Sequence, residues 1–286
     1  MALLEVKNLC KSFPTFNVKN VSFSIEPGYI VGFIGRNGAG KTTTIKSILN
    51  LTKADSGSVS IFGMDLYEHE IEIKQRIGVV LGGFDYYLDK KLRSIAQVVS
   101  RFYDNWDGSK YLGYLKKFNL DENKRVKELS EGMKVKLALA LALSHHAELL
   151  ILDEPTSGLD PVSRDELMTL FRSIVADGEC SILFSTQITS DLDKCADYVI
   201  YIKDGGIIMQ GDREEIIDGF RLVQGPKEAL TPMLRETLVG YKETAFGFNG
   251  LIREQDLAEA DGLSLARADI ESIMVYTERN NGGEQL

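Results

Sequence analysis

The stretch Gly35-Arg36-Asn37-Gly38-Ala39-Gly40-Lys41-Thr42-Thr43 decides the fold of this chain. It matches every position of the phosphate-binding pattern Gly-x-x-x-x-Gly-Lys-Ser/Thr. A short apolar run with β-branched residues precedes it at residues 29–34, and residues 43–49 follow with helical spacing. The order of strand, glycine loop and helix predicts a nucleotide site. The alternative is a glycine turn before a helix in an unrelated α/β protein, which three glycines at fixed offsets disfavour.

The residue types of this loop suit a nucleoside triphosphate. Its three glycines let successive backbone N–H groups converge on phosphate oxygens, and the helix that follows points the positive end of its dipole at the same anion. We expect Lys41 to reach the β- and γ-phosphates and the Thr42 hydroxyl to bind magnesium. Asn37, Ala39 and Thr43 complete the predicted binding loop.

Length and composition set limits on the function. The 286 residues are 44% hydrophobic and 26% charged, which is close to a globular average and leaves room for one large α/β domain or a domain with an appendage. The net charge of −9 argues against general nucleic-acid binding, because such binding depends on clustered Lys and Arg. Cys10, Cys180 and Cys195 lie far apart and favour neither a disulfide framework nor a zinc site. The most apolar region, residues 137–152, is too polar to span a bilayer, so we expect any membrane role to require a partner.

The periodicity predicts alternating strands and helices. Half-buried antiparallel strands are expected at residues 4–9 and 18–25, and further strands at 58–62, 77–81, 149–152, 181–184 and 198–202. Helices are expected at 68–77, 161–176 and 190–196, and a hairpin at 203–209. Residues 88–146 show helical spacing without a strand signal, which indicates an inserted helical subdomain. This order predicts a mainly parallel sheet covered on both faces.

The pattern weakens from about residue 212. Helices are expected at residues 214–218, 227–236 and 269–278, with Asp269 as a cap for the last one. A hairpin around Gly247 or Gly250 is expected within residues 238–252. These elements predict a small α+β appendage. It is either a regulatory or dimer-stabilising module or a passive support for the hairpin that precedes it.

Two adjacent carboxylates follow a strongly apolar run. Residues 149–152 read Leu-Leu-Ile-Leu and deliver Asp153 and Glu154 at the end of a strand, where ligands bind in open α/β sheets. We expect Asp153 to hold magnesium, and Glu154 to orient and polarise an attacking water as general base. Two solvated acids at a strand end are the alternative, which the complete phosphate loop in the same chain disfavours.

A second anion site is indicated by Leu129-Ser130-Glu131-Gly132-Met133. A serine before a Lys- and Leu-rich helix is an ordinary cap. Its hydroxyl and the exposed amide at Gly132 also make a helix N-terminus that can bind an anion. We therefore expect Ser130 to belong to a second phosphate-binding surface.

Together these motifs resemble the ATP-binding subunit of ABC transporters over roughly residues 1–211. Residues 35–42 are similar to Walker A, residues 149–154 to Walker B, and residues 129–133 to a variant of the Leu-Ser-Gly-Gly-Gln signature. Asp160 lies in a stretch that resembles the D-loop, and Phe13 falls where an aromatic usually stacks on adenine. The resemblance implies ATP and Mg²⁺ as ligands and head-to-tail pairing of two subunits. In such a pair Ser130 and Gly132 contact the γ-phosphate bound in the other subunit.

The resemblance also implies the fold class and the domains. We expect an α/β P-loop NTPase of ABC type: a mixed sheet, an antiparallel β-subdomain, an inserted helical subdomain at about 84–146 and a small α+β C-terminal appendage. The boundary is expected at 211, with residues 1–211 as the ATP-binding domain and 212–286 as the accessory domain. The expected partners are a second copy or a paired ATPase subunit and an integral membrane permease, which places the chain at the cytoplasmic face of the cell membrane.

Two positions depart from the family pattern. Gly82 stands where the family usually has Gln, and Asp85 is a weak candidate to replace that side chain. Gln187 stands where the family has its switch His. Its amide can donate a hydrogen bond to the γ-phosphate but cannot carry the imidazolium charge or shuttle a proton. We therefore predict that ATP binding is kept and hydrolysis is slow, with Gln187 either natural or introduced.

Finer features favour one functional class and leave two others open. The loop after residue 81, the Leu-Ser-His-His before Walker B and the short appendage are most similar to exporters of small amphipathic peptides, the phenol-soluble-modulin class. Soluble ABC ATPases of DNA repair and translation share the nucleotide site, but they generally carry two such domains or a coiled coil, and the acidity of this chain disfavours nucleic acid. An ATP-gated scaffold with little turnover draws support from Gly82 and Gln187, whereas Glu154 speaks against it.

Overall fold

The computed structural model describes residues 2–81 and 87–279. The chain forms two compact units, the first ending at Gln210 and the second beginning at Gly211. No helix within these described ranges combines the length and the apolar character that crossing a bilayer requires. Each unit is described by itself.

A six-stranded sheet organises the first unit, in the order β10-β9-β3-β8-β7-β6. The pairs β3–β8, β3–β9, β7–β8 and β6–β7 are parallel, which confirms the expected mainly parallel sheet. Its strands are β3 (Ile30–Ile34), β6 (Ile77–Val80), β7 (Leu149–Leu152), β8 (Ser181–Thr186), β9 (Tyr198–Lys203) and β10 (Gly206–Asp212). Asp204 and Gly205 both have positive φ in the two-residue turn between β9 and β10, as a tight hairpin requires.

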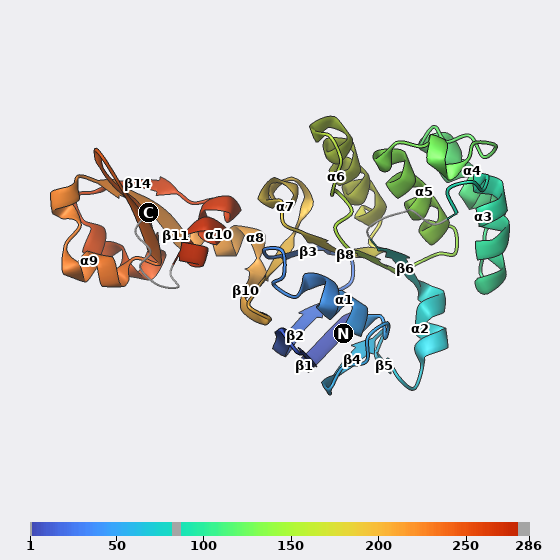
Figure 1. Cartoon of the computed structure of the whole chain (residues 1–286), viewed down its shortest axis with the longest axis horizontal. Coiled ribbons are helices and arrows are strands. Elements are labelled where there is room, and N and C mark those ends of the chain that lie inside the picture. The colour runs from blue at the N-terminus through green and yellow to red at the C-terminus, as the bar shows by residue number, and fades with distance from the viewer. Residues whose placement is uncertain (1, 82–86, 280–286) are drawn as a thin grey trace. The chain divides into compact units, whose positions relative to one another are not determined.

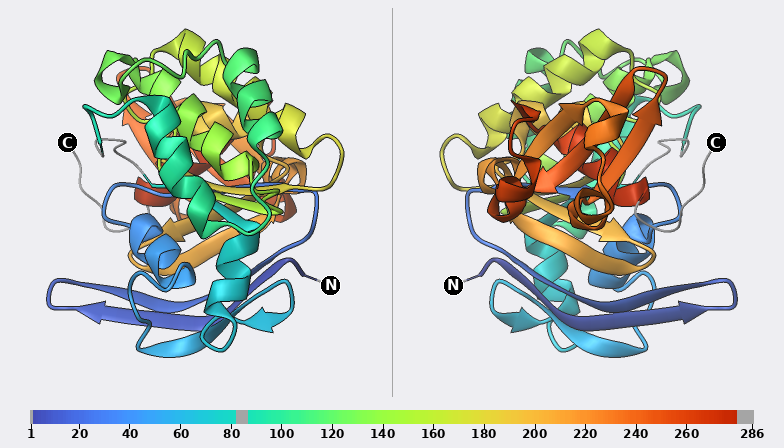
Figure 2. Two further views of the ribbon diagram at one scale, coloured as in Figure 1. Left: turned by 90° about the vertical axis from the view of Figure 1, so that its right-hand side faces the viewer. Right: turned by 90° about the vertical axis from the view of Figure 1, so that its left-hand side faces the viewer.

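A second, antiparallel sheet has the order β2-β1-β4-β5. Its strands are β1 (Leu4–Phe13), β2 (Phe16–Ile25), β4 (Ser56–Ile61) and β5 (Met64–Asp65), and the long β1–β2 hairpin is dark blue in Figure 2. Helix α1 (Lys41–Ile48) lies between the two sheets (Figure 1), and one buried apolar cluster joins all three. From α1 this cluster takes Ile45 and Ile48, both fully buried. The helix behind the phosphate loop is therefore held on both sides.

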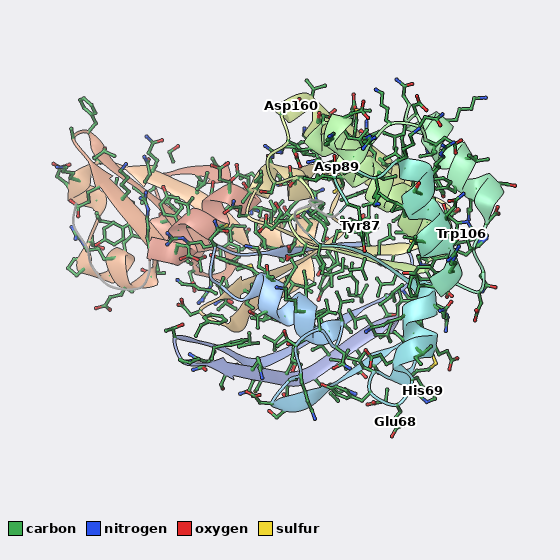
Figure 3. All side chains as sticks on the ribbon, turned by 45° about the vertical axis from the view of Figure 1, so that its right-hand side comes forward. Glu68, His69, Tyr87, Asp89, Trp106 and Asp160 are labelled. Carbon is green, nitrogen blue, oxygen red and sulfur yellow. The ribbon has the colours of Figure 1, made fainter. Side chains whose placement is uncertain are left out.

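The helical subdomain contains α3 (Leu92–Val99), α4 (Gly108–Lys117) and α5 (Glu131–Leu143), with 3₁₀ turns η1 (Ser100–Phe102) and η2 (Val126–Glu128). These helices group beside the β6 edge of the main sheet (Figure 1), and α5 packs against β6. Trp106, labelled in Figure 3, packs its ring 5.7 Å from that of Tyr111, centroid to centroid, as expected for a residue that packs the insert. Helix α2 (Glu70–Arg76) precedes β6, while α6 (Pro161–Val175) and α7 (Thr189–Cys195) pack against β3.

The second unit is a four-stranded antiparallel sheet in the order β12-β13-β11-β14, with helices. Its strands are β11 (Phe220–Gly225), β12 (Gly240–Thr244), β13 (Gly247–Arg253) and β14 (Ser264–Arg267). Its helices are α8 (Arg213–Asp218), η3 (Lys227–Ala229), α9 (Pro232–Thr237), η4 (Glu254–Ala260) and α10 (Ile270–Arg279). Asp269 caps α10 as expected, because its Oδ1 accepts a hydrogen bond from the Ser272 N–H at 2.7 Å. Strands β11 and β14 have no counterpart among the elements predicted from the sequence, and the single helix predicted at 227–236 is divided into η3 and α9.

Candidate nucleotide site

The phosphate loop runs from the end of β3 into α1, and its glycines are required by space and by backbone conformation. Gly38 and Gly40 have φ of 83° and 113°, a region that favours glycine. A Cβ at Gly35 would lie 2.4 Å from the Ile202 carbonyl oxygen. Gly40 is the N-terminal flanking residue of α1, so the loop leads directly into the free N–H groups of the helix. This is the geometry that the sequence pattern predicts for an anion cradle.

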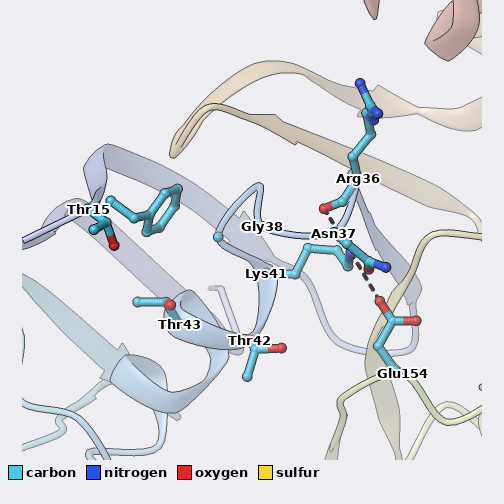
Figure 4. A pocket seen from close by; sticks show the side chains of 10 residues that line it. Thr15, Arg36, Asn37, Gly38, Lys41, Thr42, Thr43 and Glu154 are labelled. Carbon is cyan, nitrogen blue, oxygen red and sulfur yellow. Dashed lines mark hydrogen bonds and ion pairs between the residues drawn. The ribbon is translucent and has the colours of Figure 1, made fainter. Parts of the chain in front are cut away.

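A cavity of about 450 Å³ opens over this loop (Figure 4). Its lining includes most of the predicted binding residues, together with one residue of the Walker B segment: Asn37, Gly38, Gly40, Lys41, Thr42, Thr43 and Glu154. Ala39 does not line it but is buried within the loop, where its N–H donates to the Arg36 carbonyl oxygen at 3.1 Å. The structure thus brings the two motifs, far apart in sequence, to one cavity.

The aromatic residue at this cavity is Phe16, whereas the sequence analysis selected Phe13. A Cβ at Gly40 would lie 3.0 Å from the Phe16 ring, and Phe16 also packs against the buried core. Phe13 is 41% exposed, and its ring faces the Lys11 ammonium at 5.7 Å. The two residues are cross-strand partners beside the same hairpin turn. Phe16, which begins β2, lines the cavity and Phe13 does not, so the geometry favours Phe16 over Phe13 as the aromatic residue beside the phosphate loop.

Lys41 is held between the loop backbone and Glu154. Its side chain is only 5% exposed, and its Nζ donates to the carbonyl oxygens of Gly35 at 2.7 Å and Arg36 at 3.3 Å. Nζ also forms an ion pair with Glu154 Oε1 at 3.0 Å, which is drawn as a dashed line in Figure 4. The ammonium group is therefore held at the cavity by two backbone carbonyl oxygens and by the Glu154 carboxylate.

Asp153 and Glu154 follow β7 but take different environments. Asp153 is 6% exposed, and its Oδ1 accepts a hydrogen bond from Ser185 Oγ at 2.6 Å. The same Ser185 Oγ accepts from the Glu154 N–H at 2.9 Å. Glu154 has φ of 49°, a strained value for a residue with a side chain, and such strain is typical of functional sites. The turn separates the two carboxylates. Ser185, on the neighbouring strand β8, was missed because a serine inside a strand carries no motif of its own.

The oxygen donors expected for magnesium come from both motifs. Thr42 lines the loop cavity, and Asp153 lines an adjoining cavity of about 380 Å³; Glu154 lines both. A hydroxyl and a carboxylate are the hard oxygen ligands that Mg²⁺ prefers, with waters and phosphate oxygens completing its octahedron. The residues present therefore fit this cation.

Ser130 caps α5, and its Oγ accepts a hydrogen bond from the Met133 N–H at 3.3 Å. Ser130 itself is exposed and is not among the residues that line the loop cavity of its own chain. Gly132 faces α6, where a Cβ would lie 3.5 Å from Ser163. Glu131 forms an ion pair with Lys134 at 2.7 Å, and both residues line the second cavity. The signature segment is thus a surface feature apart from the phosphate loop of its own chain.

Asp160 caps α6 and begins the helix shown at its label in Figure 3. Its Oδ1 accepts from the N–H groups of Val162 and Ser163, both at 3.0 Å, and its Oδ2 accepts from Ser163 Oγ at 2.6 Å. The Ser163 hydroxyl, followed by these backbone N–H groups, holds the pKa of the Asp160 carboxyl below its usual value. The carboxylate is directed at its own helix, and Asp160 does not line the loop cavity.

Of the two positions that depart from the family pattern, only Gln187 lies among the described residues. Gln187 directly follows β8 and is exposed, and it is not among the residues lining the loop cavity. Gly82 and Asp85 lie outside the described residues.

Comparison with known proteins defines the class. The family model described as ABC transporter matches residues 18–157. The bacitracin transport ATP-binding protein BcrA of Bacillus licheniformis is 36% identical over 67% of this chain and 63% of that protein. The Nod factor export ATP-binding protein I of Burkholderia lata is 34% identical over 76% of this chain and 73% of that protein.

A solved structure described as an ATP binding subunit of an ABC transporter superposes with a TM-score of 0.67. It is 29% identical over 75% of this chain and 91% of that chain. This chain belongs to the family of ABC transporter ATP-binding proteins, and the predicted fold class is confirmed.

Proposed function

We propose that this chain is the ATP-binding and ATP-hydrolysing motor subunit of an ABC transporter. Two copies, or this chain and a paired ATPase subunit, close around two Mg-ATP and drive an integral membrane permease from the cytoplasmic face of the membrane. One observation carries the proposal: the phosphate loop and the Walker B carboxylate face each other across one cavity, with Lys41 Nζ 3.0 Å from Glu154 Oε1.

Each residue of the cavity has a role in this proposal. Lys41 leaves Glu154 and binds the β- and γ-phosphates, and the released Glu154 orients a water and accepts its proton as general base. Thr42 and Asp153 hold Mg²⁺, which neutralises charge on the phosphate oxygens when bound. Phe16, in place of Phe13, offers its ring to the adenine. Ser185 keeps Asp153 and the backbone of Glu154 in place.

The second anion site belongs, in this proposal, to the nucleotide of the other subunit. Ser130 is an exposed helix cap and does not line the loop cavity of its own chain, which supports a contact with a phosphate bound by another subunit. Head-to-tail pairing supplies one. Gly132 and Asp160 then lie at the interface between the two copies.

We further propose that hydrolysis is slow and that the cargo is a small amphipathic peptide. Gln187 lacks the charge and the titratable proton that a His provides in the switch position. Export is supported by the Nod factor relative, whose name describes an export protein. The peptide class rests on the resemblance of the sequence to phenol-soluble-modulin exporters.

A second candidate function is an ATP-gated scaffold with little turnover, which Gln187 favours. Turnover separates the two candidates. Phosphate release is measured for the wild type, for Lys41→Ala and for Lys46→Ala, which removes an exposed lysine of the same helix. The motor predicts turnover that Lys41→Ala abolishes and Lys46→Ala keeps. Equal rates in all three would refute it, and tight ATP binding without turnover would favour the scaffold.

The transport role is tested in membranes. The motor predicts that the chain co-purifies from detergent with an integral membrane protein, and that cells with the wild-type chain, but not with Lys41→Ala, resist added amphipathic peptides. A stable complex with cytosolic proteins alone would contradict it.

A further inference from the structure

A buried carboxylate lies behind the nucleotide site. Asp191, on α7, is 1% exposed. Its Oδ2 accepts hydrogen bonds from Thr156 Oγ1 at 2.7 Å and from Thr186 Oγ1 at 3.4 Å, and its Oδ1 accepts from Arg164 Nη2 at 2.7 Å and Nε at 3.2 Å. A buried charge is tolerated only when it is paired and hydrogen-bonded, and Asp191 meets that condition with donors from three other segments.

These donors connect the two halves of the catalytic site. Thr156 lies two residues after Glu154, on the path to the D-loop, and Arg164 lies in the first turn of α6. On the other side, Thr186 directly precedes Gln187, and its Oγ1 accepts from the Ile188 N–H at 3.0 Å. Gln187 is thus bracketed by two residues that the network holds.

Apolar packing also holds these helices on the sheet. The rings of Phe171 on α6 and Phe184 on β8 pack 5.6 Å apart, and Leu192, next to Asp191, is fully buried. The polar network lies at the carboxyl end of β8, directly before Gln187. Donors that share one buried acceptor are coupled, because a shift of one donor moves the acceptor and lengthens its hydrogen bonds to the other donors.

We propose that Asp191 is a positioning residue that sets Gln187 relative to Glu154, so that the Walker B segment and the switch segment move as one unit. This inference rests on the proposed ATPase function. Asp191 acts through Thr156 and Thr186 and does not contact the nucleotide. Loss of the network lowers the rate of the chemical step and leaves nucleotide affinity unchanged.

Hydrogen exchange tests the coupling without requiring turnover. The variants are Asp191→Asn, Thr156→Val and the conservative Thr156→Ser, with Thr169→Val on the exposed face of α6 as control. We expect Thr156→Val to speed exchange in residues 187–190, on the far side of the network, and Thr156→Ser and Thr169→Val to keep the wild-type rate. A change confined to the residues around Thr156 would overturn the proposal.

Kinetics supplies the second readout. Asp191→Asn and Thr156→Val are expected to lower kcat by at least about tenfold with KM nearly unchanged, since misplacement by about 1 Å can cost that much or more. Unchanged kcat in a folded variant would overturn the positioning role. If the wild type shows no turnover above Lys41→Ala, the proposed function fails, and the exchange result still decides whether the two segments are coupled.

Discussion

Replacing Glu154 by Gln tests the ion pair at the centre of the nucleotide site. In the structure the Lys41 ammonium must leave the Glu154 carboxylate before it can bind phosphate, because the two groups lie 3.0 Å apart. Glu154→Gln keeps the shape and an acceptor oxygen but removes the charge. We therefore expect the variant to bind nucleotide more tightly while losing the general base.

The magnitude follows from this geometry. At 3.0 Å the direct Coulomb attraction is about 5 kcal/mol for an effective dielectric constant near 20, most of which is offset by desolvation. Glu154→Gln turns the ion pair into a hydrogen bond between the Lys41 ammonium, which stays charged, and a neutral amide oxygen, so only the difference between these two interactions, about 1–1.5 kcal/mol, is lost. A loss of this size corresponds to roughly tenfold tighter binding. Loss of a general base slows hydrolysis by about 10²–10⁴-fold.

ADP is the ligand that isolates this effect, because it contacts Lys41 without a γ-phosphate that would close a pair of subunits. Calorimetry is expected to give a Kd for ADP about tenfold lower in Glu154→Gln than in the wild type. Glu166→Gln is the matched control, since it removes an exposed carboxylate that is paired with Lys136. ADP affinity that is unchanged or weaker in Glu154→Gln, or hydrolysis that persists, would refute this reasoning.

Three further changes have expected outcomes. Gln187→His is expected to raise the steady-state ATPase rate more than about tenfold, because it restores an acid–base group, and an unchanged rate would contradict the role given to Gln187. Phe16→Ala is expected to weaken ATP binding in a fluorescence titration while Phe13→Ala does not; equal effects would contradict the proposal that the Phe16 ring, and not the Phe13 ring, contacts the adenine. Burial lowers the pKa of His145 below its usual value of about 6.5. The contribution of the neutral imidazole to the unfolding free energy is therefore fully present above that pH and is lost as the pH falls below it. His145→Asn is therefore expected to lose less unfolding free energy than the wild type between pH 7.5 and 5.5 in urea titrations. The same loss of unfolding free energy in His145→Asn and in the wild type would contradict this.

Much of the first unit could be predicted because its signals are local. The glycines of the phosphate loop are required by positive φ angles and by close backbone contacts, and they form a recognisable sequence motif. The strands β3 and β7 of the main sheet are buried and appear in the sequence as short apolar runs. The choice between Phe13 and Phe16 is not local. Both flank the same turn, and which ring covers Gly40 depends on the path of β2 past α1.

The second unit shows where periodicity fails. All four residues of β14 are exposed, so this strand has no burial pattern and exists through its pairing with β11. Gly250, one of the two predicted turn positions, lies within β13, where a Cβ would come 3.1 Å from the Gly240 carbonyl oxygen. The chain turns just before Gly247, the other predicted position, whose φ of 154° suits glycine. Close contact between neighbouring strands, and not a turn, requires the glycine at position 250.

The same limit applies to the network around Asp191. Its members lie on four segments, and the hydrogen bonds join residues that are 5 to 35 positions apart in the sequence. Asp191 was missed for this reason, and so was Ser185, which donates to Asp153 across 32 positions. Their roles depend on which strands are adjacent, and that order becomes known only from the fold.

Sedimentation velocity of Glu154→Gln with saturating Mg-ATP tests the central claim most directly, because blocked hydrolysis should preserve a closed pair. We predict a dimer with Mg-ATP, a monomer with Mg-ADP, and a monomer with both nucleotides when Ser130→Glu is added to place a negative charge at the proposed contact with the γ-phosphate. A monomer under all conditions, or a dimer that Ser130→Glu leaves intact, would contradict the proposal that each subunit completes the nucleotide site of the other.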